Sequence, residues 1–529
     1  MTRYRHLITE ENAKWWTLGA MCTALFMFML DNTVVNVALP SIQDDLGASI
    51  SGLEWTVNGY TLPFAVLLVT AGRLGDIFGR RRMFMFGVVV FSVSSATAGL
   101  APSTGALIAS RVLQGAGAAF MMPATLSIIT DAFPPEERGK AIGTWAGVSA
   151  LALAIGPVIG GVLTEHVSWR AIFFLNLPVA AVAVTAALFA VRESRDATVE
   201  RRIDYPGVAL LTAGLTALVL ALIEGNSWEW GSTRILTLFA ASAVLLIAFA
   251  VIERRIRVPM VDFGLLADRT YVGASAVAFV VSFSMLGMFF FLALYMQNIL
   301  GYSPLEAGVR FLPTTLVIVV VAPLSGRFTD RVGPRWLITA GLSLVAVALY
   351  MFTRIDATTT YSDLLPGFVL MGAGIAMTMS PMSTAAMNAV PVAKSGIASG
   401  VLTMSRMVGG TLGVAAIGAL FQAEVRSKLD GMLETFGIGS AQREQLTNQV
   451  GGGQTTDGIH GLSHHQAEVV GRAAHNAFID GLASSMRLSA AVAFAGAVIG
   501  CALVRSRRET ASVDAAGPPA PAEAEQVPA

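Results

Sequence analysis

A single carboxylate interrupts the first long apolar stretch of the chain. The run FMFMLDNTVVNVALP extends from Phe26 to Pro40, and Asp31 is its only acidic residue. A charged side chain at the centre of a membrane helix costs about 2.5–3.5 kcal/mol on insertion scales, so such residues usually face a wet cavity or a partner. Removal from water favours the neutral form of a carboxyl group, which suits reversible protonation. Asp31 is predicted to bind a proton or a cationic substrate; the alternative is that it only satisfies a neighbouring helix end or hydroxyl.

Two further polar residues lie in the fourth apolar stretch. Arg111 is about a turn and a half into this stretch, and Gln114 follows one turn later on the same helix face. The guanidinium could extend to the outer membrane surface, or it could reach inward as the counter-charge of a carboxylate. We favour the inward arrangement and predict that Asp31, Arg111 and Gln114 take part in proton coupling. Arg406, within TMSRMVGG, is a comparable arginine near the end of the chain.

A basic segment occurs twice. GRLGDIFGRRR, from Gly72 to Arg82, recurs as GRFTDRVGPR from Gly326 to Arg335, with Gly, Arg, Asp, Gly and Arg at the same spacing. Short basic loops between apolar stretches belong on the cytoplasmic face. Topology requires only the arginines, so the repeated aspartates are predicted to cap a helix or pair across helices, and thereby to close this face in one state. The predicted cytoplasmic gate comprises Gly72, Arg73, Gly75, Asp76, Gly79, Arg80, Arg81, Arg327, Asp330 and Arg335.

The composition is that of a membrane protein. Of the 529 residues, 54% are hydrophobic and only 13% are charged, compared with about 25% charged residues in soluble proteins. The mean hydropathy is +0.65. Fourteen apolar stretches are long enough to cross a bilayer: residues 15–38, 55–71, 83–101, 106–129, 141–163, 171–191, 205–223, 235–252, 271–297, 305–325, 336–353, 363–385, 397–421 and 484–504. The predicted fold class is therefore an all-α integral membrane protein.

The charges between these stretches set the orientation. Arginine and lysine gather in alternate segments, as in 80–82, 254–257 and 505–508, which is the positive-inside pattern. The N-terminal MTRYRH precedes the first stretch without an A-x-A-like cleavage site, so an uncleaved first span is expected. We predict a multi-pass protein of the plasma (inner) membrane with both termini in the cytoplasm.

The repeated segment also predicts the domain organisation. Its first copy follows span 2 and its second follows span 10, so two spans are inserted between two six-helix halves. The predicted divisions are an N-terminal half at 1–198, an inserted pair at 199–262, a C-terminal half at 263–508 with a long outer loop at 422–483, and a disordered cytoplasmic tail at 509–529. Part of the outer loop, 462–480, could form an amphipathic helix.

Enzymatic chemistry finds little support. A membrane enzyme needs a nucleophile with its base, or a metal cluster, and we find neither pattern; the P-loop sequence is also absent. Cys22 and Cys501 lie within apolar runs and are read as packing residues. The outer loop contains four histidines, His460, His464, His465 and His475. A metal site formed by them is the less favoured interpretation. We predict no enzymatic activity, no cofactor, no metal and no nucleic-acid partner.

Spans 1 and 9 are rich in methionine and phenylalanine. Such soft and aromatic side chains suit a pocket for varied apolar shapes, although lipid-facing residues look the same in sequence. The predicted substrate pocket contains Phe26, Met29, Asn36, Met285, Met288, Tyr295, Gln297 and Arg406.

Several of these segments together resemble one known family. The 72–82 segment resembles the loop signature of the major facilitator superfamily. LDNTVVNVALP (Leu30–Pro40) resembles the span 1 motif of its fourteen-span drug:proton antiporters, the EmrB/QacA type, and RVLQGAG (Arg111–Gly117) resembles the span 4 motif assigned to proton transfer. WRAIFFLNLP (Trp169–Pro178) is similar to the segment that follows span 5. The run that ends in GPVIGG resembles the span 5 antiporter motif, with Gly147, Gly156, Pro157, Gly160 and Gly161.

The resemblance implies a function. It implies the major facilitator fold and a proton-coupled multidrug exporter working by alternating access, with Asp31 as the proton site, Arg111 in the relay and Gly156/Pro157 at the seam between halves. Some relatives that take dications carry further acids in spans 10 and 13, which this chain lacks, so neutral, amphipathic or anionic substrates fit at least as well. The alternatives are a dedicated exporter of one antibiotic, lipid or metabolite and, more remotely, a membrane sensor. The expected partners are substrate, protons and lipid, with a monomer as the working unit and a periplasmic adaptor or lipoprotein left open.

Overall fold

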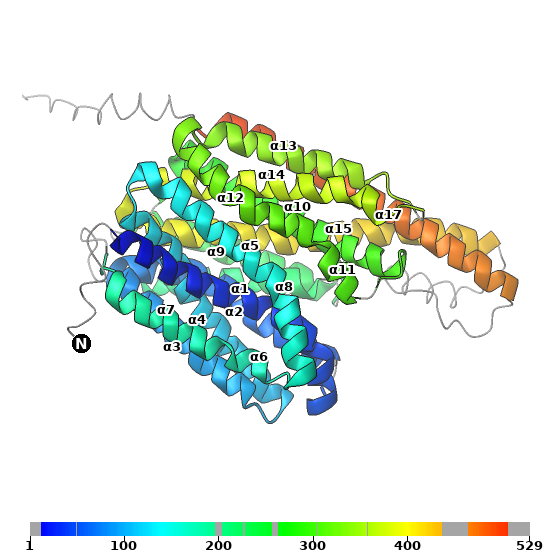
Figure 1. Ribbon diagram of the computed structural model, residues 1–529, viewed down its shortest axis with the longest axis horizontal. Coiled ribbons are helices and arrows are strands. Elements are labelled where there is room, and N and C mark those ends of the chain that lie inside the picture. The colour runs from blue at the N-terminus through cyan, green and yellow to red at the C-terminus, as the bar shows by residue number, and fades with distance from the viewer. Residues whose placement is uncertain are drawn as a thin grey trace, which may run out of the picture.

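The protein is built of helices, as the computed structural model shows (Figure 1). The structure describes residues 12–48, 50–195, 204–225, 228–256, 263–302, 304–356, 358–435 and 464–505. Over this part of the chain no strand occurs. The first group of helices is α1 (Ala13–Leu46), α2 (Ile50–Phe78), α3 (Arg80–Gly99), α4 (Thr104–Ala132), α5 (Pro135–His166), α6 (Ala171–Phe174) and α7 (Asn176–Ala190). Two helices follow, α8 (Tyr205–Glu224) and α9 (Thr233–Glu253). The last group is α10 (Arg269–Asn298), α11 (Pro304–Arg310), α12 (Leu312–Val332), α13 (Pro334–Phe352), α14 (Tyr361–Asn388), α15 (Ser395–Thr435) and α17 (His464–Leu503), with short 3₁₀ turns at Phe263–Ala267 and Val392–Lys394.

The predicted number of spans is confirmed. Within the described ranges, 14 helical segments are long and apolar enough to cross a membrane. Each overlaps one of the predicted stretches, and the short helices α6 and α11 belong to the same spans as α7 and α12. The all-helical fold class predicted from hydropathy is therefore correct.

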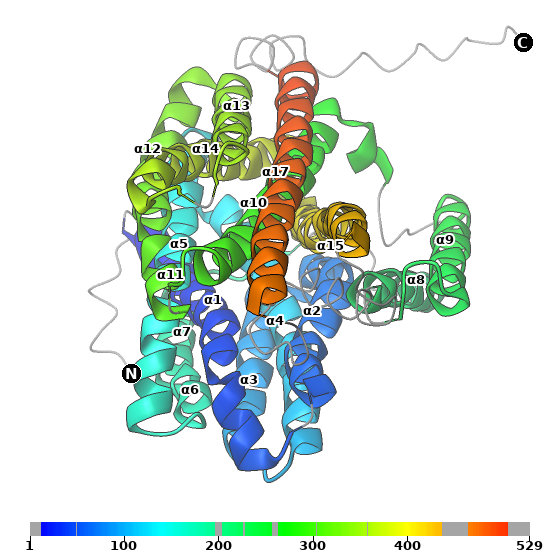
Figure 2. The ribbon, with the colours of Figure 1, turned by 90° about the vertical axis from the view of Figure 1, so that its right-hand side faces the viewer.

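Two bundles and a peripheral pair make up the molecule. Most contacts of α1 to α7 lie within that group, and most contacts of α10 to α17 lie within theirs, except that α5 and α12 contact each other more than any helix of their own group. Helices α8 and α9 pack together at one side, where α8 also touches α2 and α15 (Figure 2). The bundles meet along two seams, α2 against α15 and α5 against α12.

Each repeated segment contains a turn of a single residue, whereas the sequence predicted a loop there. Helix α2 continues to Phe78 and α3 starts at Arg80, so only Gly79 is outside a helix. In the second copy only Gly333 separates α12 from α13. Gly79 and Gly333 have φ values of 114° and 92°, a backbone conformation that favours glycine. The segments are therefore rigid helix ends that can hold their side chains in fixed positions.

The expectation of a long loop at 422–483 is wrong at both of its ends. Helix α15 runs on to Thr435 and α17 begins at His464, so the two helices project together beyond the bundle (Figure 1). Their buried apolar residues explain this: Val425, Leu429 and Leu433 of α15 line up at helical spacing, and Phe421 packs edge-on against Phe478 of α17 at 5.0 Å. At 41 residues, α15 is about 60 Å long, roughly twice the hydrocarbon thickness. The central part of the predicted loop, 436–463, and the predicted tail lie outside the described residues.

Both ends of the described chain lie at one end of the molecule. Lys14 forms an ion pair with Glu137 at the start of α5, and the backbone N–H of Arg505 donates to Thr270 at the start of α10. The repeated turns at Gly79 and Gly333 lie at this same end. We call it the repeat end, defined by residues 72–82 and 326–335.

Candidate functional site

Asp31 lies fully buried inside the first bundle, where three side chains donate hydrogen bonds to it. The Arg111 Nη1 atom is 2.6 Å from Oδ2. The amides of Gln114 and Asn176 donate to Oδ1 at 2.9 and 2.8 Å. The exposed fractions of the Asp31 and Arg111 side chains are 0% and 1%. The structure thus brings together the three residues predicted for proton coupling, and it adds Asn176.

Arg111 is held in place from several sides. Its Nη1 also donates to Gln114 Oε1 at 2.8 Å, and its Nε donates to the backbone oxygen of Thr56 at 3.2 Å. The guanidinium lies 4.2 Å from the ring centroid of Tyr60 on α2, a cation–π arrangement that is strongest away from water. Arg111 therefore reaches inward, and the snorkelling alternative does not apply in this structure.

A break between two helices positions Asn176. Helix α6 ends at Phe174 and α7 begins at Asn176, so the amide projects from the first turn of α7. Its Nδ2 also donates to Ser95 Oγ of α3 at 3.0 Å, and Ser95 in turn donates to the backbone oxygen of Phe173 at 2.8 Å. Four helices, α1, α3, α4 and α7, thus converge on one carboxylate.

This arrangement fits an ionised Asp31. All three of its donors are suited to a carboxylate, and one of them carries a full positive charge. Removing one partner of a buried ion pair typically costs about 3–5 kcal/mol, because it leaves an uncompensated charge. The carboxylate and its three donors therefore fix the relative positions of α1, α4 and α7, and Ser95 of α3 joins them through Asn176.

Three residues of this network were not predicted from the sequence. Asn176 and Ser95 lie in apolar stretches, and Tyr60 looks like an ordinary aromatic of span 2. A polar amide within the apolar run around Asn176 was the one signal that could have drawn attention to it, since such a group needs a partner inside a membrane.

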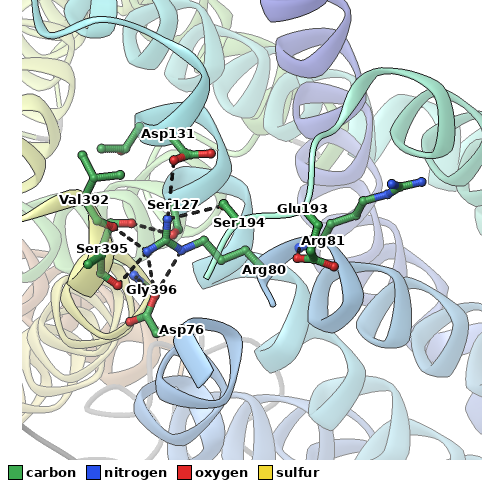
Figure 3. Close-up of polar contacts among 12 residues, drawn as sticks. Asp76, Arg80, Arg81, Ser127, Asp131, Glu193, Ser194, Val392, Ser395 and Gly396 are labelled. Carbon is green, nitrogen blue, oxygen red and sulfur yellow. Dashed lines mark hydrogen bonds and ion pairs between the residues drawn. The ribbon is translucent and has the colours of Figure 1, made fainter. Parts of the chain in front are cut away.

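At the repeat end, Asp76 joins the two bundles (Figure 3). Its carboxylate accepts from the backbone N–H groups of Gly396 and Ile397 at the start of α15, both at 2.9 Å. It also accepts from Arg80 Nε and Nη2 at 3.1 and 2.9 Å. A carboxylate suits this position because the N-terminus of a helix carries partial positive charge and unpaired N–H groups.

Arg80 extends the same contact. Its guanidinium lies between Asp76 and Asp131 and donates to the backbone oxygens of Val392 and Ala393, just before α15 (Figure 3). Asp76 and Arg80 are 0% and 1% exposed, so this cluster is as dry as the Asp31 site.

Asp330 makes the matching contact in the opposite direction. Its two oxygens accept from the backbone N–H groups of Gly139 and Lys140 in α5, at 2.9 and 3.1 Å. Each bundle therefore offers an aspartate at the end of one helix to the backbone of a helix in the other bundle. The sequence predicted that these aspartates cap a helix or pair across helices, but it did not indicate that the partner helix belongs to the other bundle.

Glycines allow the two seams to close tightly. A side chain at Gly72 would collide with the backbone of Gly396, and one at Gly326 would collide with the backbone of Gly139. Ser127 and Ser395 add a hydrogen bond of 2.7 Å between α4 and the start of α15. These contacts along both seams lie near the repeat end, which is therefore closed in this conformation.

The other predicted gate residues lie nearby in different roles. Arg81 donates to the backbone oxygen of Leu188 at 2.9 Å and points away from the seam (Figure 3). Arg73 is buried and has an interaction partner, Gly75 has open space around it, and Arg335 stacks near Trp336. Arg327 lines a cavity of about 560 Å³ between α5 and α12, together with Glu136, Glu137, Lys140, Leu324, Phe328, Asp330 and Arg331.

The glycines of the span 5 motif do not all lie at the seam between halves. Gly147 faces Val319 and Pro323 of α12 across the seam, but Gly156 and Gly160 pack on Thr33 and Val34 of α1 in their own bundle. The expectation that Gly156 forms the seam is wrong, because this stretch of α5 is the small-residue surface on which α1 rests. Pro157 lies within α5, and Gly161 has no neighbour within 4 Å.

The residues of the predicted pocket differ in how accessible they are. Met288 and Tyr295 are fully buried in the second bundle, and the Tyr295 hydroxyl donates to the backbone oxygen of Asp356 at 2.6 Å. They are packing residues in this conformation because their neighbours in the bundle enclose them. The remaining side chains that the structure describes are partly accessible, namely Phe26, Met29, Met285, Gln297 and Arg406. The side chain of Asn36 lies outside the description.

The structure was also searched for metal ligands. Among the described residues, no group of three or more His, Cys, Asp or Glu side chains could hold a metal ion. His464, His465 and His475 belong to α17, and His460 lies outside the described residues.

Comparison with known proteins was made on the whole chain. The model of the family described as Major Facilitator Superfamily matches residues 21–414. A tetracenomycin C resistance and export protein of Streptomyces glaucescens is 34% identical over 490 residues, covering 92% of this chain and 90% of that protein. Multidrug resistance protein Stp of Mycobacterium tuberculosis is 36% identical over 81% of this chain and 80% of its own length. Puromycin resistance protein pur8 of Streptomyces alboniger is 39% identical over 76% of this chain and 81% of its own length.

A solved structure shares the fold. The proton:xylose symporter XylE matches with a TM-score of 0.63 over 94% of this chain and 97% of that one, at 13% sequence identity. At this identity the match supports the architecture alone.

Proposed function

This chain belongs to the major facilitator superfamily, and we propose that it is a multidrug efflux transporter that exports apolar or amphipathic small molecules in exchange for protons. The resistance and export functions named for its relatives support drug efflux. The observation that supports proton coupling is the buried ion pair of Asp31 and Arg111. Asp31 is an acid inside a membrane span, where the gain or loss of a proton changes its charge. The chain acts as a transporter and not as an enzyme.

The proton site works through the packing of the first bundle. With Asp31 ionised, Arg111, Gln114 and Asn176 hold α1, α4 and α7 together. Protonation removes one charge of the ion pair and leaves the guanidinium to find other partners. We infer that this changes the relative position of these helices and so biases the bundle towards the conformation that opens at the repeat end.

The repeat end acts as the gate. Asp76 and Asp330 each fasten one bundle to the backbone of the other. Release of these contacts lets the bundles rock about a site in the middle of the membrane. The halves that rock are 1–198 and 263–508, and the pair at 199–262 stays at the periphery, in keeping with the contacts of α8 and α9.

The driving force is sufficient for useful export. Each proton that crosses 100 mV supplies about 2.3 kcal/mol, and each unit of pH difference supplies about 1.4 kcal/mol. One proton thus sustains a concentration ratio of tens-fold or more for a neutral compound. In this proposal the protein lies in the plasma (inner) membrane with the repeat end and both termini in the cytoplasm, functions as a monomer, and leaves open an adaptor or lipoprotein partner.

A second candidate is a dedicated exporter of one compound. Several relatives are named for a single antibiotic, whereas Stp is named for multidrug resistance. Growth inhibition of an expressing strain by a panel of unrelated compounds separates the two. Protection against one compound class identifies a dedicated exporter, and protection against several identifies a multidrug transporter.

Dye transport into inverted membrane vesicles tests the proposal. Vesicles with the protein should accumulate an amphipathic dye when a proton gradient is imposed, and a protonophore should abolish this accumulation. Vesicles without the protein are the control. Accumulation that survives the protonophore would contradict proton coupling, and saturable dye binding without accumulation would favour a sensor.

A further inference from the structure

A second arginine lies deep inside the membrane region. Arg406 is eleven residues beyond the start of α15 at Ser395, which places it about 16 Å from the repeat end, near the middle of a hydrocarbon layer about 30 Å thick. Arg406 lies farther from both ends of its span, Val392–Leu429, than Arg111 lies from the start of its span, Thr104–Ala132. Arg406 therefore ranks with the coupling pair in depth.

Arg406 differs from Arg111 because nothing in the described chain neutralises it. Arg111 has Asp31 at 2.6 Å, but no described residue forms an ion pair or a hydrogen bond with the Arg406 side chain. The Arg406 side chain is partly accessible. Its charge is therefore available to a partner that the described chain does not supply.

Arg487 shows what a lipid-facing arginine looks like in the same half. It lies in α17, also within a predicted span, but its side chain is exposed at the surface of the bundle. Such a side chain can extend along the helix to the interface. Arg406 is less exposed than Arg487, and a charge at this depth calls for a partner.

Small residues lie near Arg406 on α15. Gly409 and Gly413 lie on the same face of α15, three and seven residues further on, and a side chain at either would collide with the backbone of Phe279 or Phe283 of α10. The rings of Phe279 and Phe283 stack on each other with centroids 6.2 Å apart. The face of α15 that carries Arg406 therefore packs closely on α10, which carries these two aromatic rings.

We propose that Arg406 binds the anionic group of the transported molecule, so that the preferred substrates are amphipathic or aromatic anions such as carboxylates and acidic phenols; this rests on the proposed export function. A guanidinium donates two parallel hydrogen bonds to a carboxylate and stays charged at every relevant pH. Cationic substrates are disfavoured, because Asp31, an acid deep in a span, already accepts hydrogen bonds from Arg111, Gln114 and Asn176.

The charge of the substrate changes the energetics of exchange. At an equal number of protons, export of a monoanion moves one more charge down an inside-negative potential than export of a neutral molecule does. Each charge contributes about fiftyfold in concentration ratio per 100 mV. Anion export should therefore depend more steeply on the membrane potential than ester export.

The test uses matched compounds in proteoliposomes. Fluorescent amphiphiles on several aromatic scaffolds, including pyrene, are each prepared as a butyrate, its methyl ester and a butylammonium. Wild-type protein should export the carboxylates at least tenfold faster than the esters and the ammonium compounds. Arg406→Gln should lower carboxylate export about tenfold or more and lower ester export much less, while Arg406→Lys should retain part of the preference. Arg487→Gln, the same substitution in a lipid-facing position, should change neither.

Thermal unfolding separates recognition from folding. Loss of an enclosed charge without a partner should leave the melting temperature of Arg406→Gln equal to or above that of the wild type. A marked fall would assign Arg406 a structural role and overturn the inference, as would unchanged carboxylate export in this variant or a wild-type preference for ammonium compounds or esters. Export of none of the three charge classes by the wild type would instead contradict the proposed function itself.

Discussion

Replacing Asp76 by asparagine should open the repeat end. The carboxylate accepts from two backbone N–H groups of α15 and from Arg80. An asparagine has one carbonyl oxygen, so at least one of these hydrogen bonds is lost and the others lose their charge. Hydrogen bonds to charged groups contribute about 1.5–3 kcal/mol each. We take a net loss of about 3 kcal/mol, which lowers the ratio of closed to open molecules about a hundredfold, since 1.4 kcal/mol is tenfold.

Distances between spin labels measure this shift. Labels at cysteines replacing Arg82 and Phe328 report on the two bundles, because both side chains are largely exposed at the repeat end, at 70% and 52%. Cys22 and Cys501 are first replaced by alanine to give a cysteine-free background. The Asp76→Asn protein should show a second, longer distance that the parent protein lacks.

Two further variants sharpen the result. Asp131→Asn is the matched control, because Asp131 lies 4.0 Å from Arg80 but is 36% exposed and, unlike Asp76, does not accept from the start of α15 in the described chain. It should leave the distances unchanged. Asp330→Asn should shift the ratio by about tenfold, because Asp330, which accepts from the backbone of α5, is less buried than Asp76. An Asp76→Asn distribution identical to the parent, or an equal shift in Asp131→Asn, would refute the reasoning.

Three further predictions follow from particular contacts. Gly72→Ala should reduce transport at least tenfold, because the new methyl group meets the backbone of Gly396, whereas Gly75→Ala, which has open space, should transport normally; equal rates for the two would contradict the tight seam. Asn176→Ala should lower the free energy of unfolding by about 1–3 kcal/mol, because Asp31 and Ser95 lose a buried donor; an unchanged melting temperature would argue against the network. Hydrogen bonds from Arg170 and Trp169 lower the pKa of Asp45, so their stabilisation is complete above the ordinary carboxyl pKa of about 4 and is lost as the pH falls through the lowered value. The melting temperature of the wild type should therefore exceed that of Asp45→Asn near neutrality and converge with it in acid, and a difference that persists below about pH 3 would be inconsistent with this assignment.

The number of spans and the pairing of Asp31 with Arg111 could be predicted because they depend on local patterns. Hydropathy over about 20 residues reports a span, and a buried carboxylate needs a counter-charge within reach. Gln114 followed from its position one turn from Arg111. The repeated spacing of Asp76 and Asp330 also indicated a shared role at the repeat end.

Other features depend on three-dimensional contacts that leave little trace in the sequence. Asn176 reaches Asp31 only because the chain breaks between α6 and α7. The extended α15 and α17 are helical because each covers the other's apolar face, which cannot be seen in either segment alone. Gly156 was assigned to the wrong neighbour since a small-residue surface does not specify which helix will pack on it.

Proton-driven export by Asp31→Asn in proteoliposomes tests the central claim most directly. Asparagine keeps the size of the side chain and removes its ability to gain and lose a proton, and the protein should still insert into the membrane. We predict that the variant loses accumulation driven by a pH gradient but still exchanges labelled for unlabelled substrate without one. Full gradient-driven accumulation by Asp31→Asn would contradict the assignment of Asp31 as the coupling site.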